Sequence, residues 1–273
     1  MPVILAGVLN VTPDSFSDGG RFVAIDDAVA MGLRMVEAGA TWIDVGGEST
    51  RPGSTPVSEP EEQARVVPVI AALAAKLGGR ARISIDTFKS VTAEAALCAG
   101  ATIINDVSGG RIDPDLLAVA ARKGAGVVLG HMRGTPATMM EDTTYADVVS
   151  EVVAHLRTCV DAARESGCQE IWVDPGIGFS KRLPENLALI AQLDRLRSDL
   201  GLPVMVGVSR KRFLGDLTGK SVAERTYATA GAVAACVLAG ADVVRVHDVA
   251  EMRDVAIVAR SIFEMIPTWD KRH

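Results

Sequence analysis

Short runs of apolar, β-branched residues recur along the chain and alternate with longer segments in which apolar residues repeat every three to four positions. A continuous apolar run is typical of a parallel strand covered on both faces, and the longer repeat is typical of a helix with one buried side. The alternation therefore predicts a series of strand–helix units. We expect strands at 3–9, 42–45, 82–85, 102–104, 126–129, 171–173, 204–208 and 243–246, and helices at 25–38, 59–77, 89–99, 113–123, 143–166, 184–199, 221–239 and 249–264.

Glycine marks the ends of several predicted helices. Gly39, Gly100, Gly124 and Gly240 each stand between a helical segment and a strand, where the left-handed conformation that glycine tolerates ends a helix. Because right-handed crossovers place every helix outside the strands, the series predicts a single-domain (β/α)₈ TIM barrel over residues 1–273. An open doubly wound sheet is the alternative. It would normally carry a glycine-rich phosphate loop after the first strand, and residues 10–14 do not form one.

The composition narrows the classes of function and location. The 273 residues, with 48% hydrophobic and 23% charged side chains, suit one globular barrel with a large core. A net charge of −6 disfavours binding to nucleic acid or to an anionic membrane, since both require a cationic surface. The chain shows neither an apolar run of the roughly 18 residues that a membrane helix needs nor an apolar signal-peptide core. We therefore expect a cytoplasmic protein.

Polar residues follow the predicted strands at one common end. Asp86, Asn105 and Asp174 follow the third, fourth and sixth strands, with no basic residue beside them. Carboxylates and an amide in this arrangement suit a flat heterocycle with several N–H groups. The seventh and eighth units are basic instead and suit a phosphate group, which barrels often bind in this region. Their basic residues are Arg210, Lys211, Arg212, Arg245 and His247.

In these segments the sequence resembles the dihydropteroate synthase family of pterin-binding enzymes, and the resemblance runs from Gly7 to Asp248. Family members join a pterin pyrophosphate to p-aminobenzoate. The resemblance implies this activity, a barrel fold, Mg²⁺ as cofactor, these two small-molecule substrates and a homodimeric assembly. The motifs that carry it lie at 10–20, 44–53, 84–87, 104–110, 131–136, 174–179, 207–211 and 245–248.

The resemblance also implies roles for individual residues. Asn10 would coordinate the Mg²⁺ that bridges the pyrophosphate, and Arg245 with His247 would hold that pyrophosphate. Arg245 would in addition stack over the pterin ring. The residues implied in pterin binding are Asp86, Asn105, Asp174, Gly207, Lys211 and Arg245. Those implied in catalysis are Asp86, Asp174, Lys211, Arg245 and His247, and those implied in p-aminobenzoate binding are Thr50, Arg51, Pro52, Phe179 and Ser209.

Two positions depart from the common family pattern. Gly130 precedes His131 where many relatives carry a larger apolar residue, and Phe88 follows Asp86-Thr87. Neither removes a chemical group, so we expect them to alter the shape of the rim. His155 lies outside the motifs and reads as a surface residue.

Two other functions remain open from the residues. A pterin-binding methyltransferase would share the barrel and the acidic pocket, but it would not need the basic segments at 209–211 and 245–247 or the loop at 50–52. An inactive paralogue that only binds pterin would be expected to have lost Asn10, Asp86 or Lys211, and all three are present.

The seventh predicted helix lacks charge over most of its length. From Thr226 to Ala239 no residue is charged, and most are Ala, Val or Gly. A barrel helix normally shows a polar face to water. An uncharged outer face usually marks an interface, so this helix predicts a homodimer contact.

Overall fold

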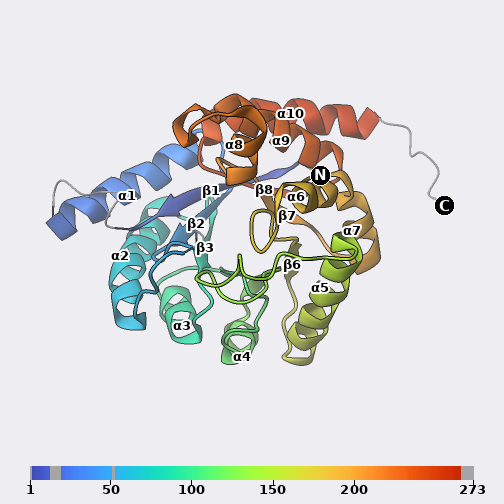
Figure 1. Cartoon of the computed structure of the whole chain (residues 1–273). Helices are drawn as coiled ribbons and strands as arrows, with labels where there is room; N and C mark the ends of the chain where they lie inside the picture. Colours follow the sequence, from blue (N-terminus) through green and yellow to red (C-terminus); the bar gives the residue numbers. More distant parts are fainter. Residues whose placement is uncertain (1, 13–19, 51–52, 266–273) are drawn as a thin grey trace.

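The computed structural model describes residues 2–12, 20–50 and 53–265. Its strands are β1 (Ile4–Asn10), β2 (Trp42–Gly46), β3 (Arg82–Asp86), β4 (Ile103–Asp106), β5 (Gly126–Gly130), β6 (Ile171–Asp174), β7 (Met205–Gly207) and β8 (Val243–Val246). All pair in parallel, in the order β6-β5-β4-β3-β2-β1-β8-β7. A parallel bridge between Val173 and Val204 joins the two ends of this sheet. The predicted (β/α)₈ barrel is confirmed (Figure 1).

The helices surround the strands (Figure 1). They are α1 (Gly20–Glu37), α2 (Glu59–Leu77), α3 (Ser90–Cys98), α4 (Asp115–Lys123), α5 (Val148–Glu165), α6 (Leu183–Ala191), α7 (Leu193–Leu200), α8 (Arg212–Thr218), α9 (Thr226–Leu238) and α10 (Val249–Met265), with a 3₁₀ turn at Val222–Glu224. Among the described residues, none of these helices is long and apolar enough to cross a membrane.

The predicted helix 25–38 begins earlier than expected, at Gly20. Three other predicted helices differ from the observed ones for identifiable reasons. The predicted helix 184–199 is interrupted at Gln192, whose φ of −123° and ψ of 31° leave the helical region. The predicted helix 143–166 begins only at Val148, because the Asp147 carboxylate accepts hydrogen bonds from the first turn and caps it there. The predicted helix 221–239 begins at Thr226, and the separate helix α8 precedes it.

The interior of the barrel is filled at the amino-terminal end of its strands. Trp42 and Trp172 pack there with ring centroids 5.3 Å apart, among Ala6, Ile103, Val128, Met205 and Val243. The Trp42 indole N–H donates to the Ser84 hydroxyl at 2.5 Å. Because this floor is closed, a ligand can enter the barrel only from the carboxyl ends of the strands, where the predicted site residues lie.

Candidate active site

The register of the strands brings the predicted residues together. Asn10 pairs with Gly46, Gly46 with Asp86, and Asp86 with Asn105, so four neighbouring strands end on one row. A Cβ at Gly46 would lie 3.6 Å from both the Asn10 Oδ1 and the Asp86 Oδ2 atoms. Glycine at this position therefore leaves room beside an amide oxygen and a carboxylate oxygen, and the carboxylate oxygen also accepts from Arg245.

Arg245 is the central cation of the site. Its guanidinium extends from β8 across the barrel, where Nε lies 2.5 Å from an Asp44 oxygen and a terminal nitrogen lies 2.6 Å from Asp86 Oδ2. Asp44 is only 1% exposed and also accepts from the Asn105 amide at 3.1 Å and from the Ser84 hydroxyl. A buried ion pair of this kind fixes the geometry of its partners.

Asp44 has no role among the predicted site residues, although it lies inside the predicted strand 42–45. The available signal was a carboxylate inside an otherwise apolar run, since such a charge is stable only when it is paired. The structure identifies the partner as Arg245.

Asp86 combines burial with an unused acceptor. Its Oδ1 atom is buried and has no hydrogen-bond partner among the described residues. Burial raises the pKa of Asp86 to about 7; the Arg245 guanidinium opposes this rise and the Asp44 carboxylate adds to it. A ligand that offers an N–H group to this oxygen would favour the ionised form.

Asp174 and Lys211 face each other on the opposite side of the barrel. Burial raises the pKa of Asp174, against the attraction of Lys211, and one oxygen accepts from the Gly176 N–H at 2.7 Å. The Lys211 ammonium donates to the Ile177 carbonyl and lies 4.5 Å from the Phe179 ring centroid. Burial also lowers the pKa of Lys211 to about 8, and the Asp174 charge opposes that fall. A bound charge would therefore change the protonation of both groups.

The basic residues near β7 and β8 do not act as one cluster. Arg210 forms an ion pair with Asp248, with 3.0 Å between Nε and one carboxylate oxygen. The Arg212 side chain is 83% exposed and lies 3.7 Å from an Asp216 oxygen. Of this set, Lys211 and Arg245 make their contacts within the site, and His247 contacts Ser209.

His247 is held by Ser209. The His247 Nδ1 and Ser209 Oγ atoms are 3.0 Å apart, and the His247 backbone N–H donates to the same oxygen at 3.2 Å. This contact sets the orientation of the imidazole ring above β8. Gly207 is paired in register with Arg245 and has no side chain to fill the space beside it.

Thr50 is half-buried at the end of the described part of its loop. The predicted residues Arg51 and Pro52 lie outside the described residues. All the other predicted site residues belong to the described part of the chain.

His155 corrects one sequence interpretation. It is half-buried on α5, with its ring centroid 4.5 Å from that of His131, and Nδ1 lies 3.2 Å from an Arg111 guanidinium nitrogen. Burial lowers the pKa of His155 to about 4, and Arg111 adds to the fall. The surface assignment was wrong because the apolar spacing of the helix does not reveal what the β5–α5 loop covers.

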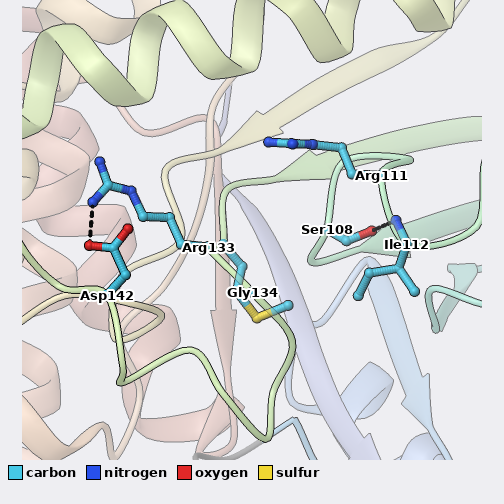
Figure 2. Close-up of a pocket in the computed structure, with 7 residues that line it drawn as sticks. Ser108, Arg111, Ile112, Arg133, Gly134 and Asp142 are labelled. Carbon is cyan, nitrogen blue, oxygen red and sulfur yellow. Dashed lines mark hydrogen bonds and ion pairs between the residues drawn. The ribbon is translucent and has the colours of Figure 1, made fainter.

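A cavity of about 490 Å³ lies beside the site, between the loops that follow β4 and β5 (Figure 2). Arg111 and Arg133 extend along opposite walls, and Arg133 is bound to Asp142 at 3.0 Å. None of the residues implied in substrate binding lines this cavity. Its lining is Ser108, Arg111, Ile112, Met132, Arg133, Gly134 and Asp142.

Comparison with known proteins gives one consistent family. The model of the family described as pterin binding enzyme matches residues 6–247. The dihydropteroate synthase of Synechocystis sp. is 44% identical over 260 residues, which cover 94% of this chain and 89% of that protein. The chain also matches bifunctional folate synthesis proteins, of which it spans about half.

Solved structures agree with these sequence relatives. The Xanthomonas albilineans dihydropteroate synthase with 4-aminobenzoic acid is 42% identical, with a TM-score of 0.89 over 97% of this chain and 94% of that one. The Yersinia pestis dihydropteroate synthase with a sulfonamide drug complex is 37% identical, with a TM-score of 0.90 over 96% and 95%.

Proposed function

The chain belongs to the pterin-binding enzyme family, and on that premise we propose that it is the transferase that makes 7,8-dihydropteroate. The substrates are 6-hydroxymethyl-7,8-dihydropterin pyrophosphate and p-aminobenzoate, and the second product is pyrophosphate. The observation that carries the proposal is the pairing of a carboxylate–amide–carboxylate set, Asp86, Asn105 and Asp174, with the inward cations Lys211 and Arg245. The place of this reaction is folate biosynthesis.

The pterin ring is assigned to the acidic side of the site. The unpaired Asp86 oxygen and the Asp174 carboxylate accept from ring N–H groups, and the Asn105 amide can both donate and accept. Lys211 binds the ring beside the space left open by Gly207. Arg245 exchanges its contact with Asp86 for the face of the ring, while Asp44 keeps the guanidinium in place.

The reaction breaks the bond between the pterin methylene carbon and the pyrophosphate oxygen. The cation that remains is delocalised into the ring, and the fixed charges of Asp86 and Asp174 stabilise it. The aryl amine nitrogen then bonds to the methylene carbon and loses a proton. Arg245 and His247 hold the departing pyrophosphate, so no covalent enzyme intermediate is needed.

A Mg²⁺ ion suits the oxygens at the ends of β1 and β3. The Asn10 amide oxygen opens toward the same space as Asp86, and Mg²⁺ binds through one or two protein oxygens with phosphate and water completing its shell. We assign Asn10 as the protein ligand. When bound, the ion neutralises charge on the leaving pyrophosphate.

p-Aminobenzoate is assigned to the rim formed by Thr50, Arg51, Pro52, Phe179 and Ser209. The Phe179 ring supplies an apolar wall beside Lys211, and the Ser209 hydroxyl is fixed by its contact with His247. Sulfonamides resemble p-aminobenzoate, and the Yersinia pestis relative is described with a sulfonamide drug complex. They should compete at this rim.

Pyrophosphate release tests the proposal. The protein is mixed with the pterin pyrophosphate, p-aminobenzoate and Mg²⁺, and pyrophosphate and dihydropteroate are measured together. We expect both products in equal amounts, a loss of activity with a chelator and recovery on adding Mg²⁺. Pterin binding without product would support the inactive paralogue instead. Methyl transfer from a pterin substrate would support the methyltransferase.

The site predicts a narrow pH optimum for kcat/KM measured with the pterin substrate. Asp86 must be ionised to accept N–H groups, so activity rises as the pH passes its pKa of about 7. Lys211 must be charged to bind the substrate, so activity falls above its pKa of about 8. The plot of kcat/KM against pH should therefore be a narrow bell. Its two limbs report the titration of the coupled site as a whole rather than of either residue alone.

The Lys211→Arg variant provides the control for this profile. Arginine stays charged throughout the range, so any activity that the variant retains should lack the basic limb. A wild-type profile that is flat between pH 6 and 9 would contradict the assignment of both groups.

We also propose a homodimer through α9, in a protein that acts in the cytoplasm as one domain over residues 1–273. Tyr227, Gly231, Ala235 and Leu238 form an exposed stripe along α9, and Tyr227 is 92% exposed. The helix α10 lies beside α9 (Figure 1) and also exposes apolar side chains. Its exposed apolar residues are Ile257, Val258, Ile262 and Met265.

A charge on this stripe should separate the subunits. Ala235→Glu places a carboxylate on an exposed position, so the monomer should fold while the interface would have to bury a charge. Ala232→Glu tests a half-buried position on the same helix. Light scattering at micromolar concentration should give twice the 28.6 kDa chain for the wild type and one chain for Ala235→Glu.

The matched control is Ser198→Glu on the exposed, charged helix α7, which should leave the dimer intact. A wild-type protein that is already monomeric at this concentration would contradict the proposed interface.

A further inference from the structure

Lys181 is a buried lysine outside the set assigned to the reaction. It lies in the segment between β6 and α6 and is 3% exposed. The ammonium donates to the Gly176 and Phe179 carbonyls at 3.0 Å each, and its nitrogen lies 2.8 Å from His131 Nδ1. Burial lowers the pKa of Lys181 well below its ordinary value, against the attraction of Asp174. In its charged form the ammonium has three N–H groups, and these three acceptors use all of them. Lys181 therefore has no donor left for a substrate.

The three acceptors of Lys181 belong to two different loops, which the lysine joins. Gly176 and Phe179 belong to the same turn, so one ammonium ties its first and last parts together. His131 belongs to the neighbouring β5–α5 loop and must be neutral at Nδ1 to accept. Burial and the charge of Lys181 keep the pKa of His131 far below its ordinary value, in agreement with that role.

The other side of the turn faces the proposed active site. The Ile177 carbonyl accepts from the Lys211 ammonium, and the Phe179 ring lies 4.5 Å from the same nitrogen. The turn thus contacts Lys181 through the Gly176 and Phe179 carbonyls, and it contacts Lys211 through the Ile177 carbonyl and the Phe179 ring. A shift of the turn would move both groups that contact Lys211.

Ser180 strengthens the join between the two loops. It adopts a φ of 53°, which is unusual for a residue other than glycine. Its hydroxyl accepts from the Arg133 N–H at 2.8 Å and donates to the Arg133 carbonyl at 3.1 Å. The Ser180 side chain is buried, and its two hydrogen bonds to Arg133 help to hold this strained backbone conformation.

We propose that Lys181 is a positioning residue that clamps the 175–180 turn to His131 and thereby sets the places of Phe179 and Lys211. It acts on p-aminobenzoate binding more than on pterin binding, because the turn itself carries Phe179. Two of the pterin residues, Asp86 and Asn105, are fixed by strand pairing, and Asp174 and Lys211 are bound to the turn by one backbone contact each. This functional consequence rests on the proposed synthase activity. The clamp itself is a property of the fold.

The Lys181→Met variant tests the clamp, with Lys123→Met, which removes a surface lysine on α4, as its matched control. Hydrogen exchange by mass spectrometry should show the amides of 176–179 exchanging about tenfold faster in Lys181→Met, with β3 and β4 unchanged. The KM for p-aminobenzoate should rise about tenfold while the KM for the pterin substrate stays within about threefold. Lys123→Met should match the wild type in both measurements.

If Lys181→Met fails to fold, a second pair of variants tests the same contact from the His131 side. His131→Asn retains an acceptor close to the Nδ1 position, whereas His131→Leu leaves one ammonium N–H unpaired. We expect His131→Asn to resemble the wild type and His131→Leu to show the same split in KM and the same faster exchange.

Equal changes in both KM values, or unchanged exchange of the turn in Lys181→Met or His131→Leu, would overturn the inference. If the wild-type protein released no pyrophosphate, the proposed function would fail, and the exchange measurements would still decide the clamp.

Discussion

Replacement of Arg245 by methionine is expected to remove nearly all synthase activity and to lower the free energy of unfolding by about 3–5 kcal/mol, the usual cost of breaking a buried ion pair from one side. Methionine retains much of the stem volume but leaves Asp44 and Asp86 facing each other without a cation. Activity should fall because the same guanidinium is assigned to the pterin face and the pyrophosphate. Urea unfolding and the product assay measure the two effects separately.

The pH dependence of the loss identifies its cause. Asp86 already has a folded-state pKa above its ordinary value, and removal of Arg245 raises it further. An acid whose pKa is raised by folding binds its proton more tightly in the native state, so stability falls as the pH rises toward that pKa. The wild type should stop losing stability from this group above its pKa of about 7, whereas the variant should go on losing stability there.

Arg82→Met serves as the control for Arg245→Met. The Arg82–Glu170 pair lies at the opposite end of the barrel, with 2.7 Å between charged atoms and roughly half-exposed side chains. Its removal should cost less than about 1 kcal/mol and leave activity unchanged. A similar cost for both variants would show that Arg245 is not an uncompensated partner of buried carboxylates.

Replacement of Gly176 by alanine should be the most damaging change of a single methyl group in the site. Gly176 has a φ of 70°, and a Cβ there would lie 1.9 Å from the His131 carbonyl oxygen. Since that neighbour is backbone, the β5–α5 and β6–α6 loops would have to separate. We expect a destabilisation of several kcal/mol and about a hundredfold loss of kcat/KM, because the turn carries Phe179 and the acceptor of Lys211.

Gly124→Ala separates the two causes of this loss. Gly124 has a φ of 64°, but a Cβ there would have no neighbour within 4 Å. Only the cost of the left-handed conformation remains, about 1–2 kcal/mol. Urea unfolding of both variants gives the steric part by difference, and equal losses would refute the close approach at Gly176.

The strands and the carboxyl-end residues could be predicted because each depends on local signals. An apolar run with a polar residue at its end locates both a barrel strand and its contribution to the site, and all eight predicted strands overlap observed ones. Glycine after a helix was equally informative: Gly124 adopts the left-handed conformation that ends α4. The family motifs then supplied the chemistry that the spacing alone left open.

The features that were missed depend on contacts between distant segments. Nothing near Asp44 indicates that its partner is Arg245, because the two lie on strands from opposite ends of the chain that meet only when the barrel closes. Lys181 likewise looks like one more charged residue before a helix. The break at Gln192 escaped detection because leucines continue at helical spacing on both sides of it.

The closeness of β5 to the β4–α4 loop has a consequence for selective inhibition. A side-chain carbon at Gly130 would lie 2.6 Å from Val107 Cα, so the loop occupies the room that a larger residue would fill. Val107 directly precedes Ser108, and Gly130 stands two residues before Met132; both Ser108 and Met132 line the cavity in Figure 2. A relative with a bulkier residue at this position must carry its loop farther out and so reshape the cavity. A compound fitted to this cavity would therefore discriminate between relatives whose substrate-binding residues are the same.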